Sequence, residues 1–381
     1  MHICYLTNEY PKKGFPHGGI GSFVKTIAVA LVKEGHQVSV IGVNYTADDE
    51  DTVEEGVHIY RLRKKHIKGI TWWYNFNRIS KKIKEIHQLQ PVNIVETSEL
   101  GLAFLRKIKD IKYVIRLHGG HHFFAESENR DVDLWKGWQE KRSFKKADAF
   151  VAVSNYVKTH TEKYLEYHNK AVELISYPIN TSLFQPIAGD IVEHQIVFAG
   201  TVCKKKGVVE LIRAFALVKE KFPNATLMIY GRDWFFPNGE SFIAMLKEKE
   251  LPNLGTLADS ITFFGAVNYE SIPSKYAQAQ VCVFPSHMET QGLVAPEAMA
   301  MGKMVVFTKL GPGAETIVDF KTGLLCDPRS PDDIAQKIIW VFENQTKSNA
   351  IGLKARDFVI GKYGLNKIVE KNKVFYNSIL D

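Results

Sequence analysis

The feature that most constrains the fold is the alternation of short apolar runs with amphipathic stretches along the chain. Runs such as residues 3–7 and 195–200 are continuously apolar, which is typical of strands buried on both faces. Between such runs lie amphipathic stretches, for example residues 21–35, which end at Gly35. Strands and helices in alternation predict parallel sheets joined by right-handed crossovers.

The alternation occurs twice, and 381 residues are enough for two domains. Residues 178–194, which hold two prolines and a glycine and show no clear period, separate the two series. We therefore expect two Rossmann-like α/β domains, residues 1–185 and 190–363, facing each other across a cleft. The last helical stretch, residues 364–381, is expected to cross back onto the first domain. Ligands of open parallel sheets bind beyond the carboxyl ends of the strands.

Composition excludes several other classes of protein. Hydrophobic residues make up 45% of the chain and charged residues 24%, as in globular proteins. We find no apolar run near the roughly 20 residues of a membrane-spanning helix and no signal-peptide pattern at the N-terminus. The four cysteines are scattered without a CxxC pair, so we expect buried free thiols and no zinc site. These features predict a cytoplasmic location.

Basic residues cluster at residues 61–68 and 78–84 of a chain whose net charge is +7. The second cluster follows a run of aromatic residues, namely Trp72, Trp73, Tyr74 and Phe76. Aromatic side chains beside a basic helix suit docking on anionic lipid, which would place the protein at the inner face of the membrane. A solvated helix face over a packed aromatic edge is the interpretation that we favour. Nucleic acid is not expected, because no recognised binding module accompanies the charge.

Two glycine-containing loops are candidate anion sites. Gly19 lies in the sequence GGIG between the first strand and the first helix, where glycines let a backbone approach a ligand and a helix N-terminus favours an anion. A plain flexible turn explains the same glycines. Lys206 precedes Gly207 at the start of another helix and is placed to reach a phosphate, although the Walker pattern is absent. The alternative for Lys206 is a surface lysine run.

Two carboxylates follow the strand that is expected to end at Ser286. Glu289 falls in the loop after this strand, and Glu297 falls in the first turn of a helix that contains Pro296 and ends before Gly302. Carboxylates at this edge of a sheet suit the paired hydroxyls of a sugar, through charge-assisted hydrogen bonds. The alternatives are a solvated loop acid for Glu289 and a residue that only complements the helix dipole for Glu297.

In combination these segments resemble the retaining glycosyltransferases of family 4, which have the GT-B fold. Between about residues 196 and 327 the resemblance is carried by AGT, KKKG, YGRD, FFGAV, FPSHMETQGLVAPEAMAMGK, GPGAE and TGLL. The N-terminal half agrees more loosely, through GGIG, RLHGG, ADAFVAVS and PINTSLF. The E-x7-E spacing in combination with EAMA-x-G, which begins at the second of these acids, is the most specific element. The resemblance implies a donor-binding domain at residues 190–363 and an acceptor-binding domain at residues 1–185 with 364–381.

The resemblance also implies roles for the matching residues of the second domain. Glu297 holds the ribose hydroxyls of the nucleotide, Glu289 lies near the transferred sugar, and Lys206 neutralises the donor diphosphate. Val267 falls where the backbone meets the nucleobase. The backbone amides that meet the donor belong to the loop after Glu289, namely Thr290, Gln291, Gly292, Leu293 and Val294.

In the first domain the resemblance implies that Gly19 lies against the diphosphate and that His118 lies close to the reacting sugar. With Lys206 and Glu289, His118 forms the expected catalytic group. One departure concerns Thr201, because the family usually has arginine there and that arginine pairs with the diphosphate. Arg232 of YGRD, or a lysine at 204 or 205, would then supply the charge; otherwise activity is weakened.

The function expected is retaining, metal-independent transfer of a sugar from a nucleotide sugar to a glycan, a lipid-linked acceptor or a small molecule, with no cofactor. A UDP-sugar is the first choice of donor, and GDP- and ADP-sugars are the others. Thr290 and Gln291 replace the commoner Gly and Phe of the family, which leaves the sugar open. The alternatives are a GT-B nucleotide-sugar epimerase and a weakly active or non-catalytic relative that binds sugar nucleotides.

Overall fold

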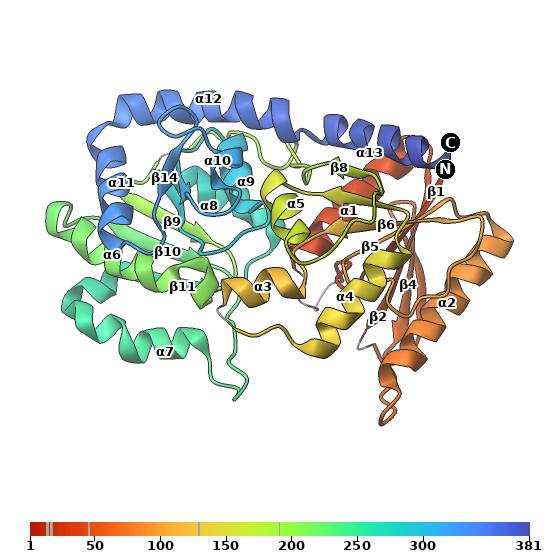
Figure 1. Ribbon diagram of the computed structural model, residues 1–381. Helices are drawn as coiled ribbons and strands as arrows, with labels where there is room; N and C mark the ends of the chain where they lie inside the picture. The colour runs from red at the N-terminus through yellow and green to blue at the C-terminus, as the bar shows by residue number, and fades with distance from the viewer. Residues whose placement is uncertain (13–14, 16–17, 45, 129, 190) are drawn as a thin grey trace. The chain divides into compact units, whose positions relative to one another are not determined.

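The computed structural model describes residues 1–12, 15, 18–44, 46–128, 130–189 and 191–381. The chain divides into two compact units (Figure 1). The first unit is Met1–Pro178 together with Leu365–Asp381, and the second is Ile179–Gly364. Each unit is a sheet of mainly parallel strands with helices packed against it. The predicted α/β organisation in two parts is therefore confirmed.

The first unit is built on a sheet that has eight strands among the described residues, in the order β3-β4-β2-β1-β5-β6-β7-β8. Only β3 and β4 pair antiparallel there, and the other described pairs are parallel. The strands are β1 His2–Leu6, β2 Gln37–Asn44, β3 Glu50–Glu54, β4 Val57–Arg63, β5 Ile94–Thr97, β6 Lys112–Leu117, β7 Ala149–Ala152 and β8 Val172–Leu174. The helices are α1 Gly19–Lys33, α2 Thr71–Leu89, α3 His121–Ser127, α4 Leu134–Lys146, α5 Asn155–Glu162 and α13 Leu365–Leu380.

The last helix, α13, belongs to the first unit and lies against α1 (Figure 1). A buried polar network holds it there. Arg116 donates to both carboxylate oxygens of Glu96, at 2.7 and 3.0 Å, and to the amide oxygen of Asn372 on α13. Tyr376 of α13 donates to Glu96 at 2.7 Å and lies 3.2 Å from the hydroxyl of Tyr5. The carboxylate of β5 and the guanidinium of β6 therefore fasten the C-terminal helix to the sheet.

The second unit is built on a sheet that has six strands among the described residues, in the order β11-β10-β9-β12-β13-β14, and its pairs are all parallel. The strands are β9 Gln195–Ala199, β10 Thr226–Tyr230, β11 Ile261–Gly265, β12 Val281–Phe284, β13 Val305–Thr308 and β14 Leu324–Cys326. The helices are η1 Lys204–Lys206, α6 Val208–Lys221, α7 Phe242–Lys249, η2 Leu251–Ser260, η3 Tyr269–Ser271, α8 Ile272–Gln278, α9 Val294–Ala300, α10 Gly313–Thr316, α11 Pro331–Glu343 and α12 Gln345–Tyr363.

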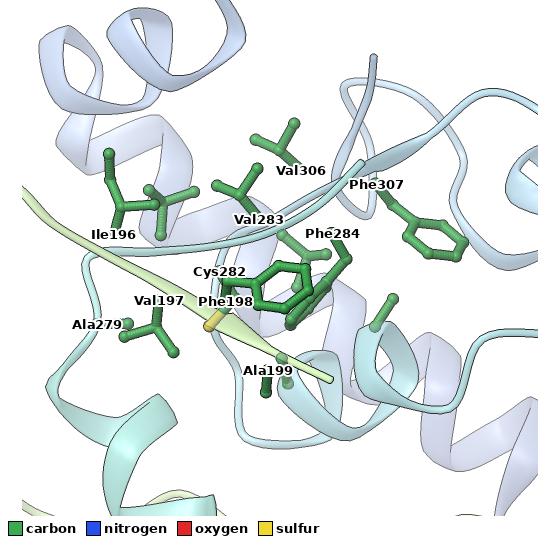
Figure 2. Close-up of a cluster of buried hydrophobic side chains, with 14 of the residues drawn as sticks. Ile196, Val197, Phe198, Ala199, Ala279, Cys282, Val283, Phe284, Val306 and Phe307 are labelled. Carbon is green, nitrogen blue, oxygen red and sulfur yellow. The ribbon is translucent and has the colours of Figure 1, made fainter. Parts of the chain in front are cut away.

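The core of the second unit follows from its apolar strands. Side chains of β9, β12 and β13 interlock between the helices (Figure 2). Val197, Cys282 and Val306 are completely buried there. Continuous burial along these strands agrees with their reading as strands that are covered on both faces. All four cysteines of the chain are buried and unpaired, as expected.

The first unit ends at Pro178, before the expected domain boundary at residue 185. Residues 179–185 were assigned to the first domain but belong to the second unit. Phe184 is the reason, because it is completely buried in the second core, with ring centroids 5.4 Å from Tyr269 and 6.3 Å from Tyr276. Within the described part of the chain, no helix has the length and apolarity needed to cross a membrane.

Candidate active site

The strand order of the second unit defines where a ligand would bind. The order changes direction between β9 and β12, which are adjacent and parallel. Such a switch point opens a crevice at the carboxyl ends of the strands. The loops after β10, β9 and β12 carry Arg232, Lys206 and Glu289 respectively. Neighbouring strands therefore bring together three residues that are far apart in the sequence.

Lys206 ends the short helix η1, which packs against the segment after β12. Gly207 permits this packing, because it has a φ of +69° and a Cβ there would lie 1.9 Å from the carbonyl oxygen of Pro285. The His287 N–H donates to the carbonyl of Lys205 at 2.8 Å. The His287 ring nitrogen Nε2 also lies 3.1 Å from a carboxylate oxygen of Glu210 on α6. The lysine loop and the acidic loop are thus fastened to each other.

Lys206 and Glu289 form an ion pair at the centre of this arrangement. The Lys206 Nζ lies 2.5 Å from Glu289 Oε1. Glu289 is only 8% exposed, so it is not the solvated loop acid of the alternative interpretation. An ammonium group has three N–H donors, so the same lysine is able to bind a phosphate oxygen. The pair keeps both charges compensated while no anion is bound.

Glu297 lies in the first turn of α9 and is 4% exposed. Its Oε1 accepts a hydrogen bond of 2.6 Å from the Tyr269 hydroxyl. Burial raises the pKa of the Glu297 carboxyl to about 7, although the hydrogen bond from Tyr269 acts in the opposite direction. Tyr269 is two residues beyond Val267, so the loop after β11 reaches the start of α9. Tyr269 was not predicted from the sequence, although its position just after Val267 is a local signal for it.

Thr201 and Arg232 lie side by side at the ends of β9 and β10. Arg232 Nε is 3.4 Å from Thr201 Oγ1. The backbone N–H of Val202 donates to the carbonyl of Arg232 at 2.9 Å, and Gly200 donates to Tyr230 in the same way at 2.9 Å. Arg232 is exposed. Its guanidinium therefore lies beside the position where the family pattern has arginine.

The loop between the two acids is enclosed by the protein. Gln291 is 1% exposed, and Gly292 is buried as well. The other members, Thr290, Leu293 and Val294, are partly buried. Leu293 precedes α9, and its carbonyl accepts the N–H of Glu297 at 2.9 Å. The expected amide segment therefore runs directly from Glu289 into the helix that carries Glu297.

In the first unit, a cavity of about 300 Å³ lies at the carboxyl ends of β1 and β5, where the strand order again changes direction. His118, which follows β6, lines this cavity. The His118 Nδ1 lies 2.5 Å from the Tyr177 hydroxyl, and the two rings are stacked. Burial, and next the nearby Arg116 charge, lower the pKa of His118 to about 3. His118 is therefore neutral at pH 7.

Gly19 is the first residue of α1, with open space around its Cα. The glycine that the packing requires is Gly21, because a Cβ there would lie 1.9 Å from the carbonyl oxygen of Glu9. Glu9 also accepts the Gly18 N–H at 3.1 Å and lines the cavity beside His118. Neither Glu9 nor Tyr177 was selected from the sequence, because a lone acid and a lone tyrosine carry no spacing signal.

Comparison with known proteins defines the class. Residues 17–183 match the model of Glycosyltransferase Family 4, and residues 187–358 match the model of Glycosyl transferases group 1. The chain therefore belongs to the family 4 glycosyltransferases of the GT-B fold.

Relatives align with the chain over almost all of its length. An uncharacterized glycosyltransferase of Methanocaldococcus jannaschii is 26% identical over 403 residues, which cover 100% of this chain and 99% of the relative. A GDP-mannose-dependent alpha-(1-6)-phosphatidylinositol monomannoside mannosyltransferase of Mycobacterium tuberculosis is 24% identical, with 97% and 96% covered.

Solved structures share the fold. Sucrose-phosphate synthase from Thermosynechococcus elongatus aligns with a TM-score of 0.86 at 21% identity, covering 99% of this chain and 98% of that one. HepE of Anabaena, solved in complex with UDP-glucose, aligns with a TM-score of 0.79 at 17% identity, covering 99% and 100%. These likenesses establish the GT-B architecture.

Proposed function

We propose that this glycosyltransferase transfers a sugar from a nucleotide sugar, with retention of anomeric configuration and without a metal ion. The acceptor is a glycan, a lipid-linked sugar or a small molecule. The observation that carries the proposal is the Lys206–Glu289 ion pair at the switch point of the second sheet, next to the helix that holds the buried Glu297. A lysine cation and two buried carboxyl groups suit a ligand that combines a diphosphate with sugar hydroxyls.

The donor is assigned to the second unit by the chemistry of each side chain. Glu297 accepts hydrogen bonds from the ribose hydroxyls, and Lys206 donates to the diphosphate. The backbone at Val267 meets the base. Glu289 faces the transferred sugar together with the amides of the loop that follows it, from Thr290 to Val294. We favour a UDP-sugar, since HepE was solved with UDP-glucose. GDP is the second choice, because the mycobacterial relative is GDP-mannose-dependent.

The chemical step breaks the bond between the anomeric carbon and the diphosphate oxygen. Negative charge develops on that oxygen, and donors already in place stabilise it without reorganisation. Lys206 and the guanidinium of Arg232 are these donors in our assignment, so no metal ion is needed. The acceptor oxygen bonds to the anomeric carbon on the face that the diphosphate leaves, and the acceptor proton passes to the leaving diphosphate. We place the acceptor in the first unit, near the neutral imidazole of His118.

A thermal-shift screen of UDP-, GDP- and ADP-sugars tests this function. One nucleotide series should raise the unfolding temperature, since a ligand at 100 times its Kd stabilises by about 2.7 kcal/mol. The preferred donor is then incubated with candidate acceptors in EDTA, and the anomeric configuration of the product is read by NMR. Product that forms without an acceptor would indicate an epimerase. If no nucleotide sugar shifts the transition, the proposed function is wrong.

Arg232 is predicted to supply the charge that Thr201 lacks. Arg232→Ala should lower kcat/KM for the preferred donor by about 10- to 100-fold, the usual worth of a hydrogen bond to a charged group. Because Arg232 Nε lies 3.4 Å from Thr201 Oγ1, the double variant Thr201→Arg/Arg232→Ala should recover part of the loss. Lys204→Ala tests the alternative supplier of that charge, an exposed lysine of the loop after β9. If Arg232→Ala lowered kcat/KM no more than Lys204→Ala does, Arg232 would not be the residue that replaces the arginine of the family.

Donor affinity is predicted to depend on pH through Glu297. Only the carboxylate form accepts hydrogen bonds from both ribose hydroxyls, and the pKa of this group is about 7. Below that pKa the protonated form prevails, so affinity should rise about tenfold from pH 6 to pH 8. Calorimetry with a nucleotide sugar measures this, because its diphosphate lacks the terminal phosphate that titrates near pH 6. Glu297→Gln should bind the nucleotide sugar weakly at every pH. If the affinity of this variant changed with pH as steeply as that of the wild type, the titrating group would not be Glu297.

A further inference from the structure

Five aromatic side chains gather on the surface of the first unit, and we call this group the aromatic shelf. Its members are Trp72 and Phe76 of α2, Phe104 of the segment after β5, and Trp135 and Trp138 of α4. The ring centroids of Trp72 and Phe104 are 4.1 Å apart, and those of Trp135 and Trp138 are 5.1 Å apart in a stack. Phe104 connects the two pairs, since it also stacks on Trp135 at 5.8 Å.

The shelf is open to solvent. Trp72 is 37% exposed, and Trp135 and Trp138 are each 46% exposed. Leu134, next to the shelf at the start of α4, is 89% exposed. The rings pack on one another, as expected for an aromatic edge, but Trp72, Trp135 and Trp138 also keep a large exposed surface. An exposed apolar group of this size marks a surface that meets something else.

Helix α4 adds positive charge to the same surface. Its inward face carries Gly137, Glu140, Ser143 and Phe144, which are buried. Its outward side chains are exposed, namely Leu134, Trp135, Lys136, Trp138, Lys141, Arg142 and Lys145. Within the helix, the outward face is thus mainly apolar over its first half, where Lys136 is the exposed charge, and basic over its second half; the exposed Asp133 precedes the helix. At 1.5 Å per residue, the basic half extends about 10 Å along the axis from the last tryptophan.

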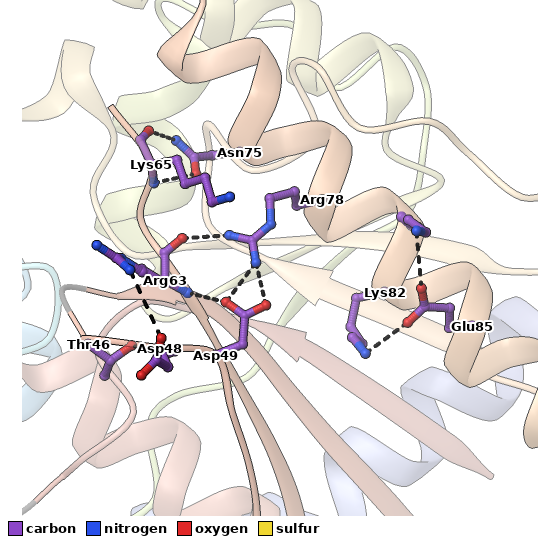
Figure 3. A network of polar contacts seen from close by, with 10 residues as sticks. Thr46, Asp48, Asp49, Arg63, Lys65, Asn75, Arg78, Lys82 and Glu85 are labelled. Carbon is purple, nitrogen blue, oxygen red and sulfur yellow. Dashed lines mark hydrogen bonds and ion pairs between the residues drawn. The ribbon is translucent and has the colours of Figure 1, made fainter. Parts of the chain in front are cut away.

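The shelf is held by rigid elements. Arg78 of α2 bonds the carboxylate of Asp49 and the carbonyl of Arg63, and Asn75 bonds the backbone of Lys65 at 2.9 and 3.2 Å (Figure 3). These bonds fix the first turns of α2, which present Trp72, to Asp49 before β3 and to the end of β4 and the residue Lys65 beyond it. Because Asp49 neutralises Arg78, the positive charge that would attract an anionic ligand to the shelf comes from α4 and not from this part of α2.

We propose that the aromatic shelf docks on a lipid bilayer that carries anionic headgroups. Indole rings settle at the level of the headgroups, with their apolar body inward and their N–H in a wet layer. Lysine and arginine beside them are attracted to acidic lipids, and this combination on one helix face is typical of interfacial helices. The stacked Arg142, whose guanidinium lies 5.5 Å from the Trp138 ring, combines both features. A neutral soluble glycan would stack on the rings but leave the row of cations unmatched.

Vesicle co-sedimentation of the full chain tests the proposal. The protein should sediment with vesicles of phosphatidylcholine and phosphatidylglycerol, much less with phosphatidylcholine alone, and less in high salt. Leu134→Ser and Trp135→Ser should each lower the partition coefficient about tenfold, because each removes a side chain that the bilayer would bury. Leu89→Ser is the matched control: Leu89 is 90% exposed at the far end of α2, and its loss should change nothing.

Two results would overturn the proposal. The first is that Leu134→Ser and Leu89→Ser bind the vesicles equally well. The second is that Trp135→Ser loses binding to a soluble oligosaccharide while its vesicle binding is unchanged. Thermal shifts by the preferred nucleotide sugar, measured on the same proteins, show that the variants are folded. The membrane proposal and the donor-site proposal are tested independently. Leu134→Ser should keep the thermal shift induced by the nucleotide sugar, and Lys206→Ala should keep its binding to vesicles.

Discussion

Replacing Lys206 by alanine should lower kcat for sugar transfer by about 10² to 10³, equivalent to about 2.7–4 kcal/mol of barrier. The reason is that Lys206, whose Nζ lies 2.5 Å from the buried carboxylate of Glu289, is assigned to bind the diphosphate. Negative charge develops on the diphosphate in the transition state, and Lys206 would stabilise it. The variant also leaves Glu289 buried without its partner. Steady-state kinetics with the preferred donor measures the loss, and a melting curve separates it from unfolding.

Lys204→Ala is the control for Lys206→Ala. Lys204 lies in the same short helix and is exposed, so its loss changes the net charge equally and should alter kcat less than threefold. If both variants kept wild-type kcat, the diphosphate would have to be held elsewhere, and the assignment of the switch-point loops would be wrong.

Replacing Arg116 by methionine should cost about 3–5 kcal/mol of unfolding free energy, because it leaves a buried carboxylate without its cation. Arg116 is completely buried and Glu96 is 2% exposed. The variant also removes the bond to Asn372 on α13, so amide exchange in that helix should rise. Urea denaturation measures the stability, and hydrogen exchange reports on α13.

Arg213→Met provides the matched comparison. Arg213 makes a two-pronged pair with Glu250, at 2.9 and 2.8 Å, but its side chain is 55% exposed. Surface pairs of this kind contribute about 0–1 kcal/mol. Equal losses for the buried and the exposed arginine would show that the Arg116 network does not hold the C-terminal helix.

Much of the fold was predictable because it depends on local periodicity. Apolar runs such as β9 and β12 are buried along their whole length, and between them helices alternate with the strands β10 and β11. The first unit ends at Pro178 and not at residue 185, because prolines mark a turn but do not show which core the next aromatic side chain joins. Phe184 packs on residues nearly a hundred positions away, and no local pattern contains that information.

The candidate site was predictable in its residues but not in its contacts. Glu289 and Glu297 were recognised by their spacing, and Lys206 by its place before a helix. That Lys206 contacts Glu289 follows from β9 lying beside β12, which only the sheet order determines. Tyr269 and Tyr177 hold Glu297 and His118 by hydrogen bonds at 2.6 and 2.5 Å; such partners depend on tertiary packing.

A crystal structure of the protein with the nucleotide sugar that gives the largest thermal shift tests the account most directly. We predict that Lys206 Nζ donates to a diphosphate oxygen and that both ribose hydroxyls bond the carboxylate of Glu297. A nucleotide sugar bound at another place, with the Lys206–Glu289 pair and the Glu297–Tyr269 bond unchanged, would contradict the account.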